Sequence, residues 1–234
     1  MKKRIWELDA FRGICILGMV AVHFVYDLTV LYRLVDWTPP LWFSYLQQWG
    51  GVLFLLLSGV CVTLGHHHIR RGLLVFGCGL AVSFVTGMMY LLHMADKAVI
   101  IYFGVLHCLG ACMLLWHFFR KLPPWVLAAL GLPMAAVGIL LLQCRFDVPM
   151  LLAIFGLANP NFVSADYFPL LPYFGFFLLG GALGKILYQE KTTRFPKVNG
   201  DNLVIRSLTF CGRQSLWIYL LHQPILTALF WLIA

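Results

Sequence analysis

Residues 9–32 read DAFRGICILGMVAVHFVYDLTVLY, and this stretch decides the fold class. It is mostly apolar and longer than the roughly 20 residues that a helix needs to cross a bilayer. It also carries Asp9, Arg12, His23 and Asp27, and ionisable groups inside a membrane span are costly and usually functional. No small-residue cleavage site follows the run. The stretch therefore predicts an uncleaved transmembrane helix that bears functional groups.

The whole chain continues this pattern. Of its 234 residues 62% are hydrophobic and 11% are charged, and the mean hydropathy is +0.87. Soluble domains carry about 25% charged residues, so this composition excludes them. A strand-built barrel would need alternating polarity instead of unbroken apolar runs. We therefore predict an all-α, polytopic transmembrane bundle that forms a single domain over residues 1–234. Seven spans are expected, at residues 9–32, 41–64, 72–93, 98–118, 124–143, 167–188 and 213–233.

The net charge of +8 does not indicate a nucleic-acid partner, because the basic residues lie in short loops between apolar runs. Twelve of them fall on one side of the predicted bundle: Lys2, Lys3, Arg4, Arg70, Arg71, Arg120, Lys121, Lys185, Lys191, Arg194, Lys197 and Arg206. Three fall on the other: Arg33, Lys97 and Arg145. By the positive-inside rule, the N-terminus is cytoplasmic and the C-terminus is outside. The plasma (inner) membrane is the expected location.

The cysteines do not indicate a zinc site or a redox pair. All seven cysteines lie in or beside apolar runs without a CxxC pair, so we interpret them as buried and expect no metal. The triplet at residues 66–68 is interpreted as a solvated histidine loop. Gly180, Gly181 and Gly184 form a small-residue face typical of helix packing, which makes a homodimer possible.

The polar residues of the first span share one helix face. Arg12 and His23 are eleven residues apart, which corresponds to about 16 Å along a helix. Asp27 follows His23 by four residues, and Asp9 precedes Arg12 by three. The spacing predicts an anchor for phosphates at Arg12 and a general base at His23 that is oriented by Asp27.

Two further histidines lie about nine residues into their predicted spans, His107 in the fourth and His222 in the last. Three histidines at one expected depth indicate a polar cavity in the bundle. Tyr219 extends the polar face of His222. The loop at residues 144–166 ends at Asp166 and is expected to line an external mouth.

Several blocks, in order along the chain, resemble the catalytic domain of the heparan-alpha-glucosaminide N-acetyltransferase family. The first is Asp9-Ala10-Phe11-Arg12-Gly13 with His23-Phe24-Val25-Tyr26-Asp27, and its spacing is also similar to that of the acyltransferase type 3 membrane proteins. The others are Tyr102-Phe103-Gly104-Val105-Leu106-His107, Asp166-Tyr167-Phe168-Pro169-Leu170-Leu171-Pro172, Gly212-Arg213-Gln214-Ser215-Leu216 and Tyr219-Leu220-Leu221-His222-Gln223-Pro224. The better-known relatives have ten or eleven spans.

The resemblance implies transfer of an acyl group, with acetyl the expected one, from cytoplasmic acyl-CoA to a polar acceptor such as a sugar. His23, Asp27, His107 and His222 are the expected catalytic residues. Arg12, Gly13 and Arg213 are expected to bind acetyl-CoA or another acyl-CoA, and Asp166 and Tyr219 the acceptor. Membrane lipid is the expected surrounding partner. The midplane histidines leave two alternatives open, a b-type haem redox module and a proton-coupled transporter. A structural subunit is a third alternative.

Overall fold

The computed structural model describes residues 5–198, 200 and 202–233, so Lys2, Lys3 and Arg4 lie outside the described part. Over these residues the chain is helical for most of its length. The described part contains no β-strand, only an isolated bridge between Phe103 and Tyr167. The prediction of an all-α fold is confirmed.

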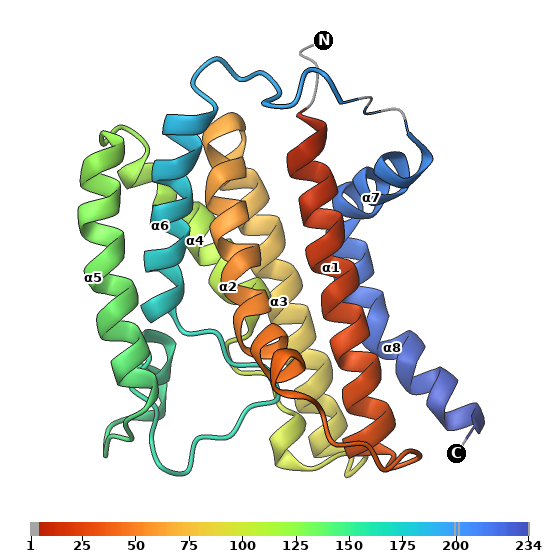
Figure 1. The fold of residues 1–234 in the computed structure, drawn as a ribbon. Coiled ribbons are helices and arrows are strands. Elements are labelled where there is room, and N and C mark those ends of the chain that lie inside the picture. The colour runs from red at the N-terminus through yellow and green to blue at the C-terminus, as the bar shows by residue number, and fades with distance from the viewer. Residues whose placement is uncertain (1–4, 199, 201, 234) are drawn as a thin grey trace. The chain divides into compact units, whose positions relative to one another are not determined.

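The helices follow one another in the order in which Figure 1 colours them. They are α1 (Trp6–Tyr26), η1 (Asp27–Leu31), α2 (Leu41–Leu64), α3 (His68–Leu91), η2 (Lys97–Val99), α4 (Val105–Phe119), α5 (Pro124–Leu142), η3 (Met150–Phe155), α6 (Leu170–Leu187), α7 (Leu203–Arg213) and α8 (Ser215–Ile233). The η1 segment is a π-helical continuation of α1, and η2 and η3 are 3₁₀-helices. Pro124 begins α5, where its missing N–H costs no helical hydrogen bond.

Six helical segments among the described residues are long and apolar enough to cross a membrane: α1 with η1, α2, α3, α5, α6 and α8. The expected fourth span differs, because α4 has only 15 residues and begins at Val105 rather than at residue 98. Residues 100–103 instead pair with the loop that precedes α6, where Phe168 N–H donates to the Phe103 carbonyl at 3.0 Å. The count of seven spans and the orientation remain predictions.

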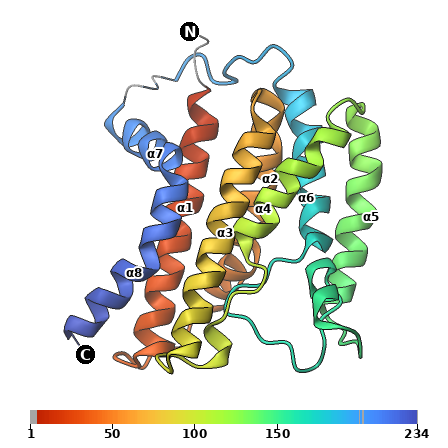
Figure 2. The ribbon, with the colours of Figure 1, turned by 180° about the vertical axis from the view of Figure 1, so that it is seen from behind.

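The chain divides into two compact units. Unit 1 comprises Met1–Phe54 and Glu190–Ala234, and unit 2 comprises Leu55–Gln189. In unit 1, α1 and α8 run side by side in the same direction and α7 lies across α1 near its start (Figures 1 and 2). Many large apolar side chains of α8 are exposed, as expected for a helix that faces lipid.

Glycines allow α7 to approach α1 closely. A Cβ added at Gly13 would collide with the Leu208 carbonyl oxygen, and a Cβ added at Gly212 would collide with the Asp9 carbonyl oxygen. Only glycine permits this backbone contact. The contact brings Arg213, at the end of α7, to the residues at the start of α1.

Glycines also determine the packing of unit 2. A Cβ at Gly180 of α6 would collide with the Leu56 carbonyl oxygen of α2, and one at Gly184 would lie 2.7 Å from Thr63 Oγ1. The third glycine of this face, Gly181, contacts the Trp116 ring of α4. The glycine face that made a homodimer possible is thus occupied within unit 2. It gives no argument for a dimer, because its grooves are filled by α2 and α4.

The loop that precedes α6 is packed onto unit 2. Phe162 and two alanines of this loop form a small buried cluster against which Tyr167 packs. The Tyr167 hydroxyl donates to the Ala153 carbonyl at 2.7 Å, and burial raises the pKa of Tyr167 to about 12. The segment is therefore a structured part of the fold.

Candidate functional site

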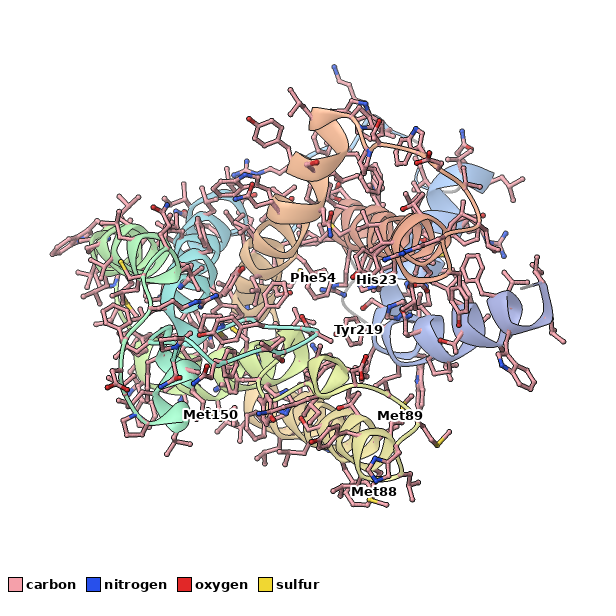
Figure 3. The ribbon with its side chains drawn as sticks, turned by 90° about the horizontal axis from the view of Figure 1, so that it is seen from below. His23, Phe54, Met88, Met89, Met150 and Tyr219 are labelled. Carbon is pink, nitrogen blue, oxygen red and sulfur yellow. The ribbon has the colours of Figure 1, made fainter. Side chains whose placement is uncertain are left out.

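A polar cluster lies between α1 and α8 in unit 1. We call it the α1–α8 cluster and define it by His23, Asp27, Tyr219, His222 and Gln223. The His23 and His222 rings contact edge to face, with centroids 4.9 Å apart and planes inclined at 63°. The Tyr219 ring lies 5.5 Å from that of His222. Figure 3 shows His23 on α1 and Tyr219 on α8 close to each other. The structure therefore assembles residues from the two ends of the chain.

His222 is held in one tautomer. Its Nδ1 lies 2.5 Å from the Tyr219 carbonyl oxygen, one turn earlier in α8. A carbonyl can only accept a hydrogen bond, so Nδ1 carries the proton. In the neutral ring the lone pair is then on Nε2, which is buried and has no hydrogen-bond partner. His222 thus presents a free basic nitrogen in a site where its side chain is almost fully buried.

The partner of Asp27 differs from the prediction. Asp27 was expected to orient His23, but its carboxylate accepts a hydrogen bond from Gln223 Nε2 at 3.0 Å. Asp27 is 1% exposed and lies where α1 continues as a π-helix, a distortion often found at functional sites. No hydrogen bond joins His23 to Asp27 among the described residues. Helical spacing predicted a shared face correctly but could not show that α8 supplies a competing donor.

Gln223 is the residue that sequence reasoning missed. Its Nε2 is engaged by Asp27, whereas its Oε1 is buried without a hydrogen-bond partner. The described part of the chain has three such buried atoms, and two of them are His222 Nε2 and Gln223 Oε1. The sequence feature that could have identified Gln223 is its position next to His222 inside an apolar run. Its importance becomes visible only through the bond to Asp27.

A second polar group lies where α7 meets α1. Asp9 forms ion pairs with two arginines, with Arg12 Nη1 at 3.4 Å and Arg213 Nε at 3.5 Å. The structure thus brings together the two arginines predicted to bind acyl-CoA, and one carboxylate compensates only part of their charge. Gly13 was predicted to bind acyl-CoA together with these arginines. It lies in the α1–α7 contact, where a Cβ would collide with the Leu208 carbonyl oxygen, and this close packing by itself explains why the residue is glycine.

α1 is continuous from Arg12 to His23. The rise between these residues is therefore the predicted length of about 16 Å. Within unit 1, the arginine pair and the α1–α8 cluster lie at two points along the same helix. The spacing that the sequence suggested is thus retained in the structure.

His107 lies in unit 2, and its position differs from the prediction. It was expected in mid-span but is the third residue of α4. Its Nδ1 accepts from Gly104 N–H at 3.3 Å, so the proton is on Nε2, which lies 3.3 Å from Ser83 Oγ. The Ser83 hydroxyl in turn donates to the Ile101 carbonyl. Because both ring nitrogens have partners that fix the start of α4, the structure supports a positioning role for His107.

Asp166, expected at an acceptor mouth, caps the same helix. Its Oδ2 accepts from Val105 N–H at 2.9 Å, at the first residue of α4. A Cβ at Gly104 would collide with this carboxylate. The carboxylate also complements the positive end of the helix dipole. The structure therefore gives Asp166 a structural function in unit 2.

Replacement of Asp166 by alanine is expected to destabilise the protein by about 1 kcal/mol, because an N-terminal N–H of α4 loses its acceptor. Thermal unfolding of the purified protein in detergent measures this. Asp147→Ala is the matched control, since Asp147 is an exposed acid in the same connecting region. Equal unfolding temperatures for the two variants would contradict the capping function.

Among the described residues, no group of three or more histidine, cysteine or acidic side chains could hold a metal ion. Residues 4–224 match the family model described as "Heparan-alpha-glucosaminide N-acetyltransferase, catalytic". The chain belongs to this family. The match covers nearly the whole chain and confirms the resemblance based on the sequence blocks. The chain matches none of the curated proteins or solved structures with which it was compared. The heparan-alpha-glucosaminide N-acetyltransferase family is one of membrane acetyltransferases, in agreement with the six apolar helices.

Proposed function

We propose that the chain is an acyltransferase of the plasma (inner) membrane. It transfers an acyl group, which we propose to be acetyl, from cytoplasmic acyl-CoA to a polar acceptor. The observation that carries the proposal is the free, buried Nε2 of His222 in contact with His23. Acyl transfer needs a base for the acceptor, and neutral imidazole is suited to that function. Family membership supports acetyl as the acyl group.

The donor binds through its phosphates at Arg12 and Arg213. Two guanidinium groups on one carboxylate retain net positive charge, and arginine binds phosphate in bidentate geometry. The pantetheine arm of CoA then runs along α1 towards His23. The length of about 16 Å between Arg12 and His23 is comparable with the reach of that arm.

In the chemical step one bond to the acyl carbon forms, another breaks, and one proton moves from the acceptor to the leaving thiolate by way of His222. The acceptor's hydroxyl or amino group gives its proton to His222 Nε2 as its oxygen or nitrogen forms a bond with the acyl carbon. The bond between this carbon and sulfur breaks, and the CoA thiolate leaves and takes up the same proton from His222 Nε2, which returns the imidazole to its neutral form. His23 is exposed beside His222 and receives the thioester. Contact between the two rings holds the base next to the reacting carbon.

The acceptor is a polar molecule with an amino or hydroxyl group. His222 Nε2 and Gln223 Oε1 are both hydrogen-bond acceptors without a donor, on adjacent residues of α8. A primary amine carries two N–H groups and can satisfy both. Asp27 fixes the Gln223 amide and thereby directs the free Oε1. Tyr219 lies beside His222 and contributes to acceptor binding.

The test uses the full chain purified in detergent, acetyl-CoA labelled in the acetyl group, and glucosamine as a probe acceptor. Wild-type protein is expected to release CoA and transfer the label. His23→Asn is expected to bind acetyl-CoA normally but to turn over at least about tenfold more slowly, a loss of about 1.4 kcal/mol in transition-state stabilisation.

His93→Asn is the control, because His93 is exposed outside the proposed machinery and asparagine tolerates its positive φ. The proposal fails if wild type neither binds acetyl-CoA nor releases CoA. The visible absorption spectrum of the same preparation tests the haem alternative, and a flux assay in liposomes tests transport.

A further inference from the structure

A second buried and unpartnered nitrogen lies in unit 2, outside the proposed catalytic machinery. It is Nε2 of His68, the first residue of α3, and the His68 residue is only 8% exposed. The His68 ring lies against that of His117 of α4, with centroids 5.8 Å apart. A buried polar atom without a partner is costly and calls for an explanation. The surroundings of His68 suggest a ligand.

The start of α3 has no side-chain cap and no acidic residue in its first turn. Its first N–H groups are therefore available, and they carry the positive end of the helix dipole. Arg71 Nη1 would lie 3.4 Å from a Cβ placed at Gly65, so this guanidinium folds back over the loop that enters the helix. Arg120 at the end of α4 is a charged neighbour of His68.

This end of unit 2 contains cations without acids. The start of α3, the end of α4 and the end of α6 lie at the same end of the unit (Figure 1). They carry five cationic residues: Arg70, Arg71, Arg120, Lys121 and Lys185. The acids of unit 2 are Asp96, Asp147 and Asp166, none of which lies at these three helix ends, and Glu190 follows α6 as the first residue of the second segment of unit 1. Only Lys185 has a described partner for its charged group, the carbonyls of Arg120 and Leu122.

We propose that the uncapped start of α3, together with His68, His117, Arg71 and Arg120, forms a phosphate-binding site. Helix N–H groups, guanidinium groups and an imidazole are the donors that recognise a phosphate group. A metal ion fits less well, because the neighbouring charged groups are cationic. The phosphate belongs either to the headgroup of an anionic lipid or to a soluble phosphate ester such as CoA. Both are available on the cytoplasmic side, where these residues are predicted to lie.

The test measures binding, not turnover, and so does not depend on the proposed acyl transfer. Four probes are titrated into the full chain in detergent: CoA, dephospho-CoA, dioctanoyl phosphatidic acid and dioctanoyl glycerol. The apparent Kd is obtained from the ligand-induced change in unfolding temperature. Wild type is compared with His68→Gln and Arg120→Gln, and with Arg145→Gln as a control at an exposed arginine on the opposite end of unit 2.

A phosphate-bearing probe is expected to bind at least about tenfold more weakly to His68→Gln and Arg120→Gln than to wild type and Arg145→Gln, since a charge-assisted hydrogen bond contributes about 1.5–3 kcal/mol. Binding of phosphatidic acid alone identifies a lipid site. CoA is also proposed to bind at Arg12 and Arg213, so its binding counts for this site only where both variants weaken it. Such a loss, without a change for phosphatidic acid, identifies a site for soluble phosphate esters, and dephospho-CoA shows whether the 3′-phosphate is the group bound. An apparent Kd unchanged by both variants, or no binding of either phosphate, overturns the proposal. Because Arg12 and Arg213 remain intact in these variants, failure here leaves the acyltransferase proposal standing.

Discussion

Replacement of His222 by asparagine is expected to lower the rate of acetyl transfer by about 10²–10⁴-fold, the usual contribution of a general base. Asparagine retains an N–H near the position of Nδ1 and can still donate to the Tyr219 carbonyl. It has no atom at the position of Nε2, the nitrogen proposed to take the acceptor's proton. Binding of acetyl-CoA is expected to be unchanged, because Arg12 and Arg213 lie elsewhere on α1 and α7.

The measurement is label transfer from acetyl-CoA, made together with an unfolding curve for each variant. His93→Asn removes an exposed imidazole by the same chemical change and is expected to retain the wild-type rate. A His222→Asn variant that folds and still transfers at half the wild-type rate or more would refute the assignment of the base. A Gln223→Leu variant that accepts glucosamine normally would likewise remove Gln223 from the proposed acceptor site.

Replacement of Gly212 by alanine is expected to destabilise unit 1 by about 2–3 kcal/mol. The new Cβ would collide with the Asp9 carbonyl oxygen, and backbone on both sides leaves no flexible side chain that could move away. The helices α1 and α7 must then separate. Thermal unfolding in detergent should show a midpoint lower by roughly 5–10 °C.

Gly18→Ala on α1 is the matched control, because a Cβ there meets nothing within 4 Å. This change is expected to stabilise the helix by about 0.5–1 kcal/mol through reduced backbone entropy in the unfolded chain. Gly212→Ala should in addition weaken acetyl-CoA binding, since separation of the helices removes Arg213 from Asp9. Equal stability of the two variants would show that the α1–α7 contact relaxes without cost.

The sequence predicted the elements of the fold well where hydrophobicity alone determines them. Long apolar runs form helices in a membrane because every backbone polar group must be paired within its own segment. Six of the seven expected runs therefore contain helices long enough to span, including the run at 9–32. The run at 98–118 forms only the shorter helix α4, because residues 100–103 are extended and pair with the chain near Phe168. That pairing is between distant segments, which local hydrophobicity does not reveal.

The candidate site was predicted only in part. Sequence indicated His23, Asp27 and His222, and the ion pairs of Asp9 show that the two expected arginines converge. It also placed His107 and Asp166 in the chemistry, although the described contacts use both to fix the start of α4. The type of a residue and its position within an apolar run do not show whether its side chain caps a helix or takes part in a reaction. In both cases a polar residue lies among apolar ones.

By itself, then, the sequence determined the fold class, the family and the polar face of the first helix. These follow from the length of the apolar runs, from the succession of motifs along the chain and from helical spacing, none of which requires contacts between distant residues. Tertiary structure alone decided which polar atoms are satisfied. Asp27 and Gln223 are 196 residues apart in sequence, and their hydrogen bond exists only because α1 and α8 pack together. Within the described part of the chain, the same packing leaves His222 Nε2 buried without a hydrogen-bond partner.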